Sequence, residues 1–505
     1  MQHRIMRIKV STLNRELTAM DKNPIQQDFL IGATGLANCG IEINLGAGFS
    51  AYVDQESDFV SIESGMGPVI VIGDFWDPFE PLQSRRQILD RSIGECKGIE
   101  DFLDRTKAWT GSYVTVVGGI NPVVIPDAFA TYQIFYGVDG QGKTWCGRSP
   151  EEVFSRIQKH VQLKGGHVSG MEICFAPETR LVGQLTWISG ISQLEPHHTL
   201  DLQTGKSHRN WPTVALKRGD YRKTVSLAAQ ILSGSANAIS NRHEHLYSAL
   251  TAGTDSRITW CAMKSTGRPA HSFTFKYSNL DMQSSEIQVP LKLTNQLGGI
   301  HEIIEASHIW DGPEVFQSRY GREAFCLNSN FSEVARTFYR AHPILFRTRL
   351  ITIYEQIYNT ASTRSELDQV LRELRTGPRK LGWDIRDLFY WEQRMPHWVV
   401  PTWRFGANDG RLLNLFNCQL LFETFLGIKP RFRQGSRAKF FLNLMDALCP
   451  GASSVPINPP TQFKQSALRF ANKSVIFHQI KWLLHYFRVK TKVTPAMPGL
   501  RGQKG

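Results

Sequence analysis

The sequence predicts two domains of different class, an α+β domain followed by a helix-rich α/β domain built on a parallel sheet. The chain has 505 residues, whereas a single hydrophobic core stops growing at about 250–300 residues. The first two-fifths consist of short β-rich runs broken by glycine. The remainder consists of long amphipathic helices that alternate with a few strands, which is typical of an α/β nucleotide domain.

Composition places the chain among globular proteins and favours an anionic partner. Hydrophobic residues make up 41% and charged residues 20% of the sequence. No apolar run approaches the roughly 18–20 residues that span a bilayer, and the opening MQHRIMRIKV lacks the apolar stretch of a secretory signal. We therefore expect no membrane span and a cytoplasmic location. The net charge of +13 suits nucleotides, nucleic acids and membrane surfaces, and its sign does not choose among them.

The cysteines and the C-terminal tail carry weaker signals. Eight cysteines are scattered without a CxxC pair or a His/Cys cluster at zinc spacing, so we expect reduced, mostly buried thiols and no structural metal. Residues 471–505 form a basic C-terminal tail with interspersed aromatic side chains. This tail is either a solvated end or a contact for lipid or nucleic acid.

The first domain is expected over residues 1–210. A helix is predicted over residues 87–96, and a turn over residues 139–142. A last strand-rich stretch covers residues 181–202 and closes on a turn at 203–206, so the boundary should fall between about 205 and 220. The other predicted strands are residues 29–31, 59–62, 69–72, 113–117, 122–125 and 132–136.

The second domain is expected over residues 211–470. It should open with a helix over residues 221–239. Residues 245–250 (HLYSAL) can form a buried strand, and residues 256–266 (SRITWCAMKST) can form a helix that ends at Gly267. A short turn of small residues, 251–255, joins the two.

This turn is the candidate phosphate site. A strand that enters a helix through small residues exposes backbone N–H groups at the helix N-terminus, where they and the helix dipole hold phosphate. Thr251, Thr254 and Ser256 add hydroxyl groups, and Asp255 can cap the helix or bind a magnesium ion that bridges phosphates. The alternative is a plain tight connection with Asp255 as its N-cap. The spacings GxxxxGK[ST] and GxGxxG are absent here.

Residues 250–257 (LTAGTDSR) resemble the SGGxDS pyrophosphate loop of the asparagine-synthetase-like ATP pyrophosphatases. Residues 271–276 (HSFTFK) are similar to the strand that lines the adenine pocket of that family, and residues 297–301 (LGGIH) to its LGxxH segment. The resemblance implies an α/β ATP-pyrophosphatase domain of HUP-like fold that uses ATP and Mg²⁺, with Asp255 as a metal ligand. The nucleotide contacts it implies are Leu250, Thr251, Ala252, Gly253, Thr254, Asp255, Ser256, Phe273 and Phe275.

Other segments fit this family less closely. Pro290 should kink or shorten a helix over residues 284–297. Residues 384–394 and 435–439 resemble the C-terminal helices of the family, in which a lysine at the position of Lys439 contacts pyrophosphate; a solvated lysine is the alternative. Residues 327–333 (LNSNFSE) keep only the terminal glutamate of the SGxGxDE loop. Glu333 is therefore either a base or magnesium ligand, or the ion-pair partner of Arg336 or Arg340.

The front domain resembles the glutamine amidotransferase domain of asparagine synthetases, which implies an Ntn-hydrolase-like sandwich. The resemblance lies in residues 111–117, 127–136, 146–150 and 193–202. That domain uses a cysteine directly after Met1, whereas this chain has Gln2 there and its first cysteine is Cys39. The usual glutaminase activity should be absent, so nitrogen would come from ammonia, a substrate amine or a partner.

The predicted function is that of an ATP-dependent ligase. It would adenylate a carboxylate, release pyrophosphate and form an amide with ammonia or an amine; a homodimer is compatible with this function. One alternative is a nucleotide-binding pseudoenzyme or regulatory protein. Another is an RNA-modifying ATP pyrophosphatase, but the absent zinc ribbon argues against nucleic acid as the partner.

Overall fold

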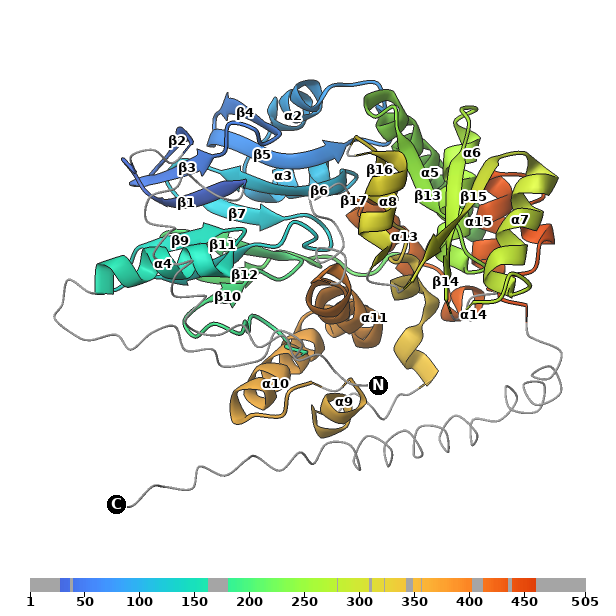
Figure 1. Cartoon of the computed structure of the whole chain (residues 1–505). Coiled ribbons are helices and arrows are strands. Elements are labelled where there is room, and N and C mark those ends of the chain that lie inside the picture. Colours follow the sequence, from blue (N-terminus) through green and yellow to red (C-terminus); the bar gives the residue numbers. More distant parts are fainter. Residues whose placement is uncertain are drawn as a thin grey trace, which may run out of the picture.

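The computed structural model describes residues 28–36, 40–161, 180–278, 280–307, 311–321, 323–341, 348–355, 357–401, 412–434 and 438–459. Figure 1 shows two parts. We call the described residues up to Arg209, which begin in blue, the front part, and those from Tyr221 onward, which end in red, the rear part. Gln2, Cys39, residues 435–437 and the tail 471–505 lie outside the described residues, so the expectations that rest on them stay predictions. Within the described ranges, none of the helices has the length and apolar character that a bilayer crossing requires.

The front part contains two antiparallel sheets, each with six described strands. The first has the order β10-β8-β9-β1-β3-β2 and the second the order β12-β11-β7-β6-β5-β4. The first is made of β1 (Phe29–Ala33), β2 (Ile41–Gly46), β3 (Phe49–Val53), β8 (Phe135–Val138), β9 (Thr144–Gly147) and β10 (Ser192–Gln193). The second is made of β4 (Phe59–Ser64), β5 (Gly67–Trp76), β6 (Thr110–Val117), β7 (Val123–Pro126), β11 (His198–Asp201) and β12 (Lys206–Arg209).

These sheets and three helices form four layers in the order α, β, β, α. Side chains alternate between the two faces of a strand, and β5 shows the result. Ile70 and Ile72 enter the core between the sheets, whereas Val69 and Val71 pack with α2 (Arg85–Ile93) and α3 (Ile99–Thr106) on the outer face. On the other side, α4 (Pro150–Val161) covers the first sheet through Val153.

The predicted elements of the front part have somewhat different bounds in the structure, and one helix and one strand show the reason. Helix α2 runs over Arg85–Ile93 because Ser84 and Gln87 form a capping box at its start, and Gly94 follows its end. The strand predicted over 132–136 begins only at Phe135. The backbone N–H of Tyr132 donates to the buried Asp127 carboxylate at 2.9 Å, which holds this stretch in a turn.

The rear part is built on a parallel sheet of order β15-β14-β13-β16-β17 in the described residues. Its strands are β13 (Leu246–Ala249), β14 (His271–Tyr277), β15 (Ile300–Ala306), β16 (Phe325–Leu327) and β17 (Leu412–Leu413). From β13 the chain adds β14 and then β15 on one side. It then crosses over and adds β16 and β17 on the other side of β13. A doubly wound sheet opens a crevice at such a switch point, outside the carboxyl ends of its strands.

Helices cover both faces of this sheet (Figure 1). A large core joins one face to α5 (Tyr221–Arg242), α6 (Thr254–Ser265), α7 (Ser285–Leu297), α13 (Gln419–Leu426) and α15 (Lys439–Leu448). A smaller cluster joins the other face to α8 (Gly312–Tyr320). The remaining helical segments are η4 (Ser332–Arg336), η5 (Phe338–Ala341), α9 (Thr348–Tyr354), α10 (Ala361–Thr376), η7 (Pro378–Leu381), α11 (Ile385–Phe389), the π-helical η8 (Tyr390–Val399), α14 (Pro430–Arg433) and η9 (Ala452–Ser454).

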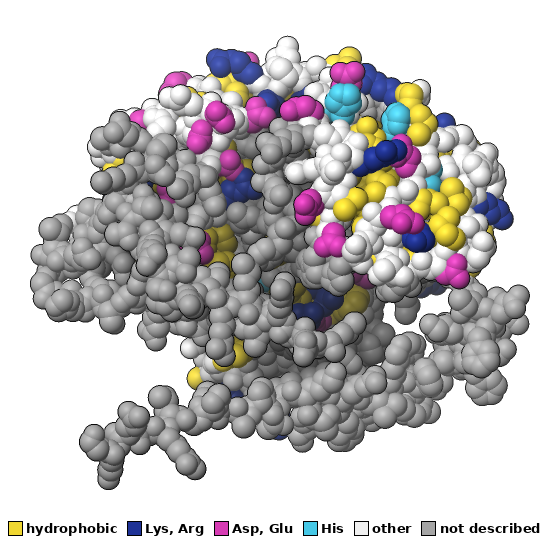
Figure 2. Space-filling view, viewed as in Figure 1, with side chains coloured by type: hydrophobic (Ala, Val, Ile, Leu, Met, Phe, Trp, Pro, Cys, Tyr) yellow, Lys and Arg dark blue, Asp and Glu magenta, His cyan; other side chains and the backbone are white. Residues whose placement is uncertain are grey.

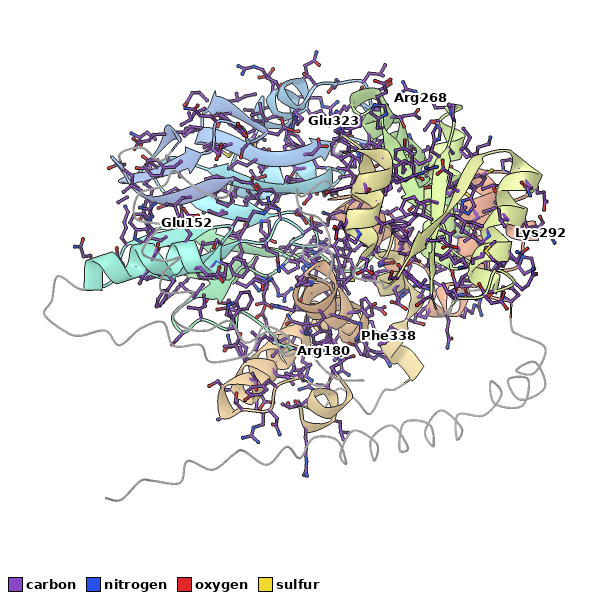
Figure 3. All side chains as sticks on the ribbon, in the orientation of Figure 1. Glu152, Arg180, Arg268, Lys292, Glu323 and Phe338 are labelled. Atoms are coloured by element: carbon purple, nitrogen blue, oxygen red, sulfur yellow. The ribbon has the colours of Figure 1, made fainter. Side chains whose placement is uncertain are left out.

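Helix α7 is not shortened at Pro290, which corrects that part of the expectation. The helix continues through this proline and ends at Leu297, followed by Gly298. Proline removes one intrahelical hydrogen bond and crowds the carbonyl four residues earlier, but Val289 and Leu293 on the same helix are buried in the large core. Lys292 lies on the exposed side of α7, as Figure 3 shows. Packing of the apolar face therefore keeps the helix intact through the proline.

The two parts share one core. Trp76, Phe129 and Val182 from the front part belong to the same cluster as the helices of the rear part. A buried ion pair reinforces this contact: the Arg209 guanidinium at the end of β12 donates to both Glu392 carboxylate oxygens of η8 at 2.8 Å. Figure 2 shows charges of both signs on the described surface, with hydrophobic side chains gathered over the rear part.

Replacing Gly234 by alanine tests the contact between α5 and the connection from β5 to α2. A Cβ atom at Gly234 would overlap the carbonyl oxygen of Pro78, which belongs to the backbone and cannot rotate away. Forcing an extra methyl group into a packed core costs about 1–3 kcal/mol. We expect Gly234→Ala to lower the free energy of unfolding by that amount in urea titrations, whereas the neighbouring Ser233→Ala should change it little. Equal stability of both variants would contradict the packing described.

Candidate functional site

The loop 250–256 lies at the carboxyl end of β13, beside the switch point of the sheet. The backbone N–H of Leu250 donates to Phe273 O at 2.8 Å, and the Thr274 hydroxyl donates to Leu250 O at 2.6 Å. Two bonds from β14 therefore fix the start of the loop. The segment that follows β16 approaches from the other side and contributes Ser332, Glu333 and Arg336.

Helix α6 begins at Thr254, two residues earlier than predicted, with Gly253 as its N-cap. Asp255 consequently lies in the first turn, and the expectation that it caps the helix is wrong. No side-chain cap bond is formed at Gly253 among the described residues. A Cβ atom on Gly253 would meet only the Thr251 hydroxyl, at 3.2 Å. The N-terminus of α6 therefore presents backbone and small side chains, which allow a phosphate to approach closely.

Within the loop, backbone N–H groups donate to side-chain oxygens. The Thr251 N–H donates to the Ser256 hydroxyl at 3.0 Å, and the Gly253 N–H donates to the Thr251 hydroxyl at 3.1 Å. The Ala252 N–H donates to a carboxylate oxygen of Glu286, in the first turn of α7, at 3.1 Å. The loop thus already binds one anionic oxygen through its backbone, the type of acceptor that a phosphate supplies.

Asp255 is the central acidic group of the site, with only 8% of its surface exposed. One carboxylate oxygen accepts from the Ser332 hydroxyl, and the other accepts from Arg336 at 3.2 Å. Burial raises the pKa of Asp255 to about 6, against the opposing effects of Arg336 and Ser332. The carboxylate therefore titrates close to neutral pH.

Glu333 forms the ion pair that was one of its two predicted roles. Arg336 lies 3.5 Å from one Glu333 oxygen, so its guanidinium bridges Glu333 and Asp255. The Tyr390 hydroxyl donates to the other Glu333 oxygen at 2.7 Å. The Glu333 side chain remains 40% exposed, and it stays available to a ligand. The side chain of Arg340 lies outside the described residues.

Phe273 and Phe275 point to the α8 face of β14. Phe273 is 1% exposed, and its ring lies 5.3 Å from that of Phe316 and 5.0 Å from that of Phe275. Phe275 is half-buried. The alternate positions of β14 carry Ser272 and Thr274, which contact the two ring nitrogens of His301 at 2.9 and 3.2 Å. Burial lowers the pKa of His301 to about 4, so its ring is neutral at pH 7.

Lys439 lies in a separate element from the loop. It is the first residue of α15 and is exposed. Helix α15 packs on the same core as α6, but no described contact joins Lys439 to the loop. Sequence reasoning did not single out Glu286, Ser332 or Tyr390 as neighbours of the site, although they lie in the segments 284–297, 327–333 and 384–394 that it compared with the family. Arg336 was noted only as a partner of Glu333.

The acidic groups fit a magnesium ion that also binds phosphates. Within the described ranges, no three His, Cys, Asp or Glu side chains converge as a metal site would require. Magnesium is usually held by one or two carboxylates together with substrate phosphates and water. Asp255 and Glu333, which both pair with Arg336, are the two carboxylates that this site offers.

Comparisons with known proteins leave the family open. No protein-family model matches the chain, and no curated protein is significantly similar to it in sequence. The NMN synthetase from Francisella tularensis is 11% identical over 56% of this chain and 99% of that chain, with a TM-score of 0.19. The glutamine phosphoribosylpyrophosphate amidotransferase from B. subtilis, complexed with ADP and GMP, is 10% identical over 55% of this chain and 59% of that chain, with a TM-score of 0.22. At such TM-scores neither likeness carries an argument.

Proposed function

We propose that the chain is an ATP-dependent ligase that adenylates a carboxylate, releases pyrophosphate and forms an amide with ammonia or an amine. The observation that carries this proposal is the loop 250–256. It joins a central parallel strand to a helix N-terminus at the switch point, with Asp255 beside it. The match of residues 250–257 to the SGGxDS pattern points to the pyrophosphate end of ATP as the ligand.

The reaction has two steps. An oxygen of the substrate carboxylate attacks the α-phosphorus of ATP, the bond from that phosphorus to the bridging oxygen breaks, and pyrophosphate leaves. The amine nitrogen then attacks the activated acyl carbon and loses a proton, and AMP leaves. No protein nucleophile takes part, so stabilisation of charge on the leaving pyrophosphate is the main demand on the protein.

The residues of the site divide these tasks. The backbone of residues 251–254 and the Ser256 hydroxyl would bind the pyrophosphate oxygens, and Asp255 would hold magnesium, which supplies Lewis-acid stabilisation when bound. Arg336 would turn from Asp255 to the phosphates. Glu333 would accept the proton of the amine, and Lys439 would add positive charge at the pyrophosphate. Strand β14, which carries Phe273 and Phe275, would line the adenine pocket.

The front part of this ligase would have an Ntn-hydrolase-like fold without glutaminase chemistry. The α, β, β, α layers support the fold. The residue before β1 is Asp28, whose carboxylate accepts from the Tyr132 hydroxyl at 2.8 Å and pairs with Arg148. Cys146 lies opposite Ile31 of β1, but its thiol is fully buried and burial raises its pKa, which makes it a poor nucleophile.

A nucleotide-binding protein without turnover is the second candidate, and the occupied site favours it. The Ala252 N–H already donates to the Glu286 carboxylate, and Asp255 already accepts from the Arg336 guanidinium. MgATP carries groups of the same two charges: a phosphate that can replace Glu286 at the loop and a cation that can replace Arg336 at Asp255. Binding therefore requires an exchange of partners, and a site that binds nucleotide without reaching catalytic geometry would serve regulation.

Gly253→Val tests the nucleotide site. Gly253 has φ −75° and ψ 177°, which valine adopts without strain, and its side chain would stand where phosphates approach. We expect the variant to fold normally and to lose MgATP binding in calorimetry by at least about 100-fold, the loss of about 3 kcal/mol. The matched control is Gly65→Val, since Gly65 lies in open space in the turn between β4 and β5.

Pyrophosphate release separates the two candidates. The wild-type chain is incubated with MgATP and a panel of carboxylates, each with ammonia or a primary amine. Release that depends on the carboxylate and disappears in Gly253→Val supports the ligase. Tight binding without release across the panel favours the non-catalytic protein. Equal MgATP binding by wild type and Gly253→Val would overturn both.

A further inference from the structure

The linker between the front and rear parts lies against η7 and against the end of α13. The Leu216 N–H donates to Leu381 O at 2.8 Å, and the Arg218 guanidinium donates to Leu426 O at 3.4 Å. At the start of α5, the Tyr221 ring lies 5.1 Å from the Phe432 ring of α14. Three segments that are far apart in the sequence, 213–223, 377–382 and 426–434, therefore meet in one place.

These three segments carry an unbalanced positive charge. Their exposed cations, which we call the basic surface, are Arg222 and Lys223 on α5, Arg379 and Lys380 on η7, Lys429 and Arg431 at α14, and Lys217 and Arg218 on the linker. None of the eight forms an ion pair with a residue that the structure describes. Asp220 is the one acidic residue in the three segments. Eight cations against one carboxylate leave seven positive charges, more than half of the net charge of +13.

Stability of the fold does not explain this gathering of charge. Arg222 and Lys223 lie in the first turn of α5, which contains no acidic residue, and the positive end of a helix dipole disfavours cations there. The Asp220 carboxylate is used as the N-cap and accepts from the Lys223 N–H at 3.0 Å. The sequence of residues 460–505 contains no aspartate or glutamate, so it offers no internal counter-charge. An anionic partner outside the chain fits these observations.

The side chains among the cations favour nucleic acid over a membrane. Within the three segments, all of which the structure describes, Val214 is the only large hydrophobic side chain that is exposed. A surface that binds a membrane buries a continuous apolar face beside its cations. Here the apolar groups are the half-buried rings of Tyr221 and Phe432, with the Arg431 guanidinium 4.7 Å from the Phe432 ring. Cations combined with aromatic rings are typical of surfaces that bind single-stranded nucleic acid.

Helix α14 also connects the basic surface to the candidate site. Arg433, which is buried, donates to Ala335 O of η4 at 2.8 Å and pairs with Asp387 at 2.5 Å. Ala335 precedes Arg336, the partner of Asp255. A ligand bound at α14 is therefore one buried side chain away from the segment that faces the loop 250–256.

We propose that the basic surface binds the phosphodiester backbone of a single-stranded nucleic acid, with Tyr221 and Phe432 in contact with bases. The four arginines supply planar forks that match phosphate oxygens, and the lysines add charge along the strand. The missing zinc ribbon counts against an RNA-modifying ATP pyrophosphatase, but backbone binding needs only cations and rings. This binding does not depend on the reaction proposed above.

The test is fluorescence anisotropy of the full-length protein with labelled oligouridine and oligothymidine of about 20 nucleotides. The surface variant combines Lys223→Gln, Arg379→Gln, Lys380→Gln and Arg431→Gln. Wild-type binding should weaken steeply with salt, because bound cations release counterions from the strand. At about 100 mM salt the surface variant should bind at least about 100-fold more weakly, and its slope of log K against log salt should be shallower by about 3. Tighter binding of one oligomer identifies RNA or DNA as the partner and supports the proposal in either case.

The matched control removes the same charge from exposed positions elsewhere, through Arg86→Gln, Lys97→Gln, Lys206→Gln and Lys292→Gln. It should bind like wild type, because exposed charges more than about 10 Å away are largely screened at this salt. If the fourfold surface variant does not fold, Arg379→Gln alone decides, with a slope shallower by about 0.7.

Four outcomes would overturn the proposal. They are an equal loss of affinity in the control, wild-type affinity in the surface variant, and absence of binding to both oligomers and to phosphatidylserine vesicles. The fourth is binding to the vesicles but to neither oligomer, which would identify a membrane surface instead.

Discussion

Asp255→Asn is expected to raise the free energy of unfolding at pH 7 by up to about 3 kcal/mol and to abolish tight MgATP binding. Burial raises the pKa of Asp255 from 3.8 to about 6, and each pKa unit corresponds to about 1.4 kcal/mol. At neutral pH the folded protein therefore carries an ionised carboxylate in an environment that favours the neutral form. Asparagine resembles that neutral form but cannot neutralise a metal ion.

The sign of the pH dependence follows from the raised pKa. Between pH 4 and 6 the folded protein holds a proton on Asp255 that the unfolded chain releases. Stability contributed by this group is therefore present at pH 4 and is lost as the pH rises through about 6. MgATP binding should show the opposite trend and strengthen through the same range, because the metal ion needs the ionised carboxylate.

Urea titrations and calorimetry with MgATP at pH 5, 6 and 7 measure both effects. The matched control is Asp104→Asn, because the Asp104 side chain is 74% exposed in a surface pair with Lys107; such pairs contribute about 0–1 kcal/mol. A loss of stability at pH 7 in Asp255→Asn would show that the ion pair with Arg336 outweighs burial. Unchanged MgATP binding would remove Asp255 from the site.

Glu392→Gln is expected to lower the free energy of unfolding at pH 7 by about 3–5 kcal/mol, the effect of breaking a buried ion pair. Glu392 is fully buried between the two parts of the molecule. Its two carboxylate oxygens accept hydrogen bonds from Nη1 and Nη2 of Arg209, and one of them lies 3.0 Å from His197 Nδ1. Glutamine would place an NH₂ group opposite Arg209 and leave Glu373 as the remaining carboxylate partner of the guanidinium.

Acid should weaken the same contact. Despite burial, Arg209 and His197 lower the pKa of Glu392 from 4.5 to about 2. A lowered carboxylate pKa contributes stability that is fully present above pH 4.5 and is lost as the pH falls towards 2. In Glu392→Gln this part of the acid sensitivity should disappear.

Urea unfolding of wild type and variant between pH 3 and 7 checks this prediction. Glu302→Gln serves as the control, because the pair of Glu302 with Arg319 is exposed on the surface and should contribute about 0–1 kcal/mol. Near-wild-type stability of Glu392→Gln at pH 7 would contradict a charged pair as the link between the two parts.

Some elements were predictable because their signals are local. Residues 245–250, 256–266 and 271–276 were predicted as strand, helix and strand, and β13, α6 and β14 confirm them with small shifts. Buried runs, small turn residues and helix periodicity act over a few neighbouring residues, so the sequence shows them directly. Helix boundaries were less accurate, because caps such as Ser84 with Gln87 depend on a few specific side-chain bonds.

The sequence by itself determined the class of the two parts and the loop at residues 250–256 between a strand and a helix. Only the tertiary structure decided what surrounds that loop. Arg336, which pairs with Asp255, lies 81 positions further along the chain, and Glu392, which pairs with Arg209, lies 183 positions further. Burial and shifted pKa values depend on such distant segments meeting. No local pattern encodes them, because side-chain periodicity specifies which face of an element is buried and not which partner it meets.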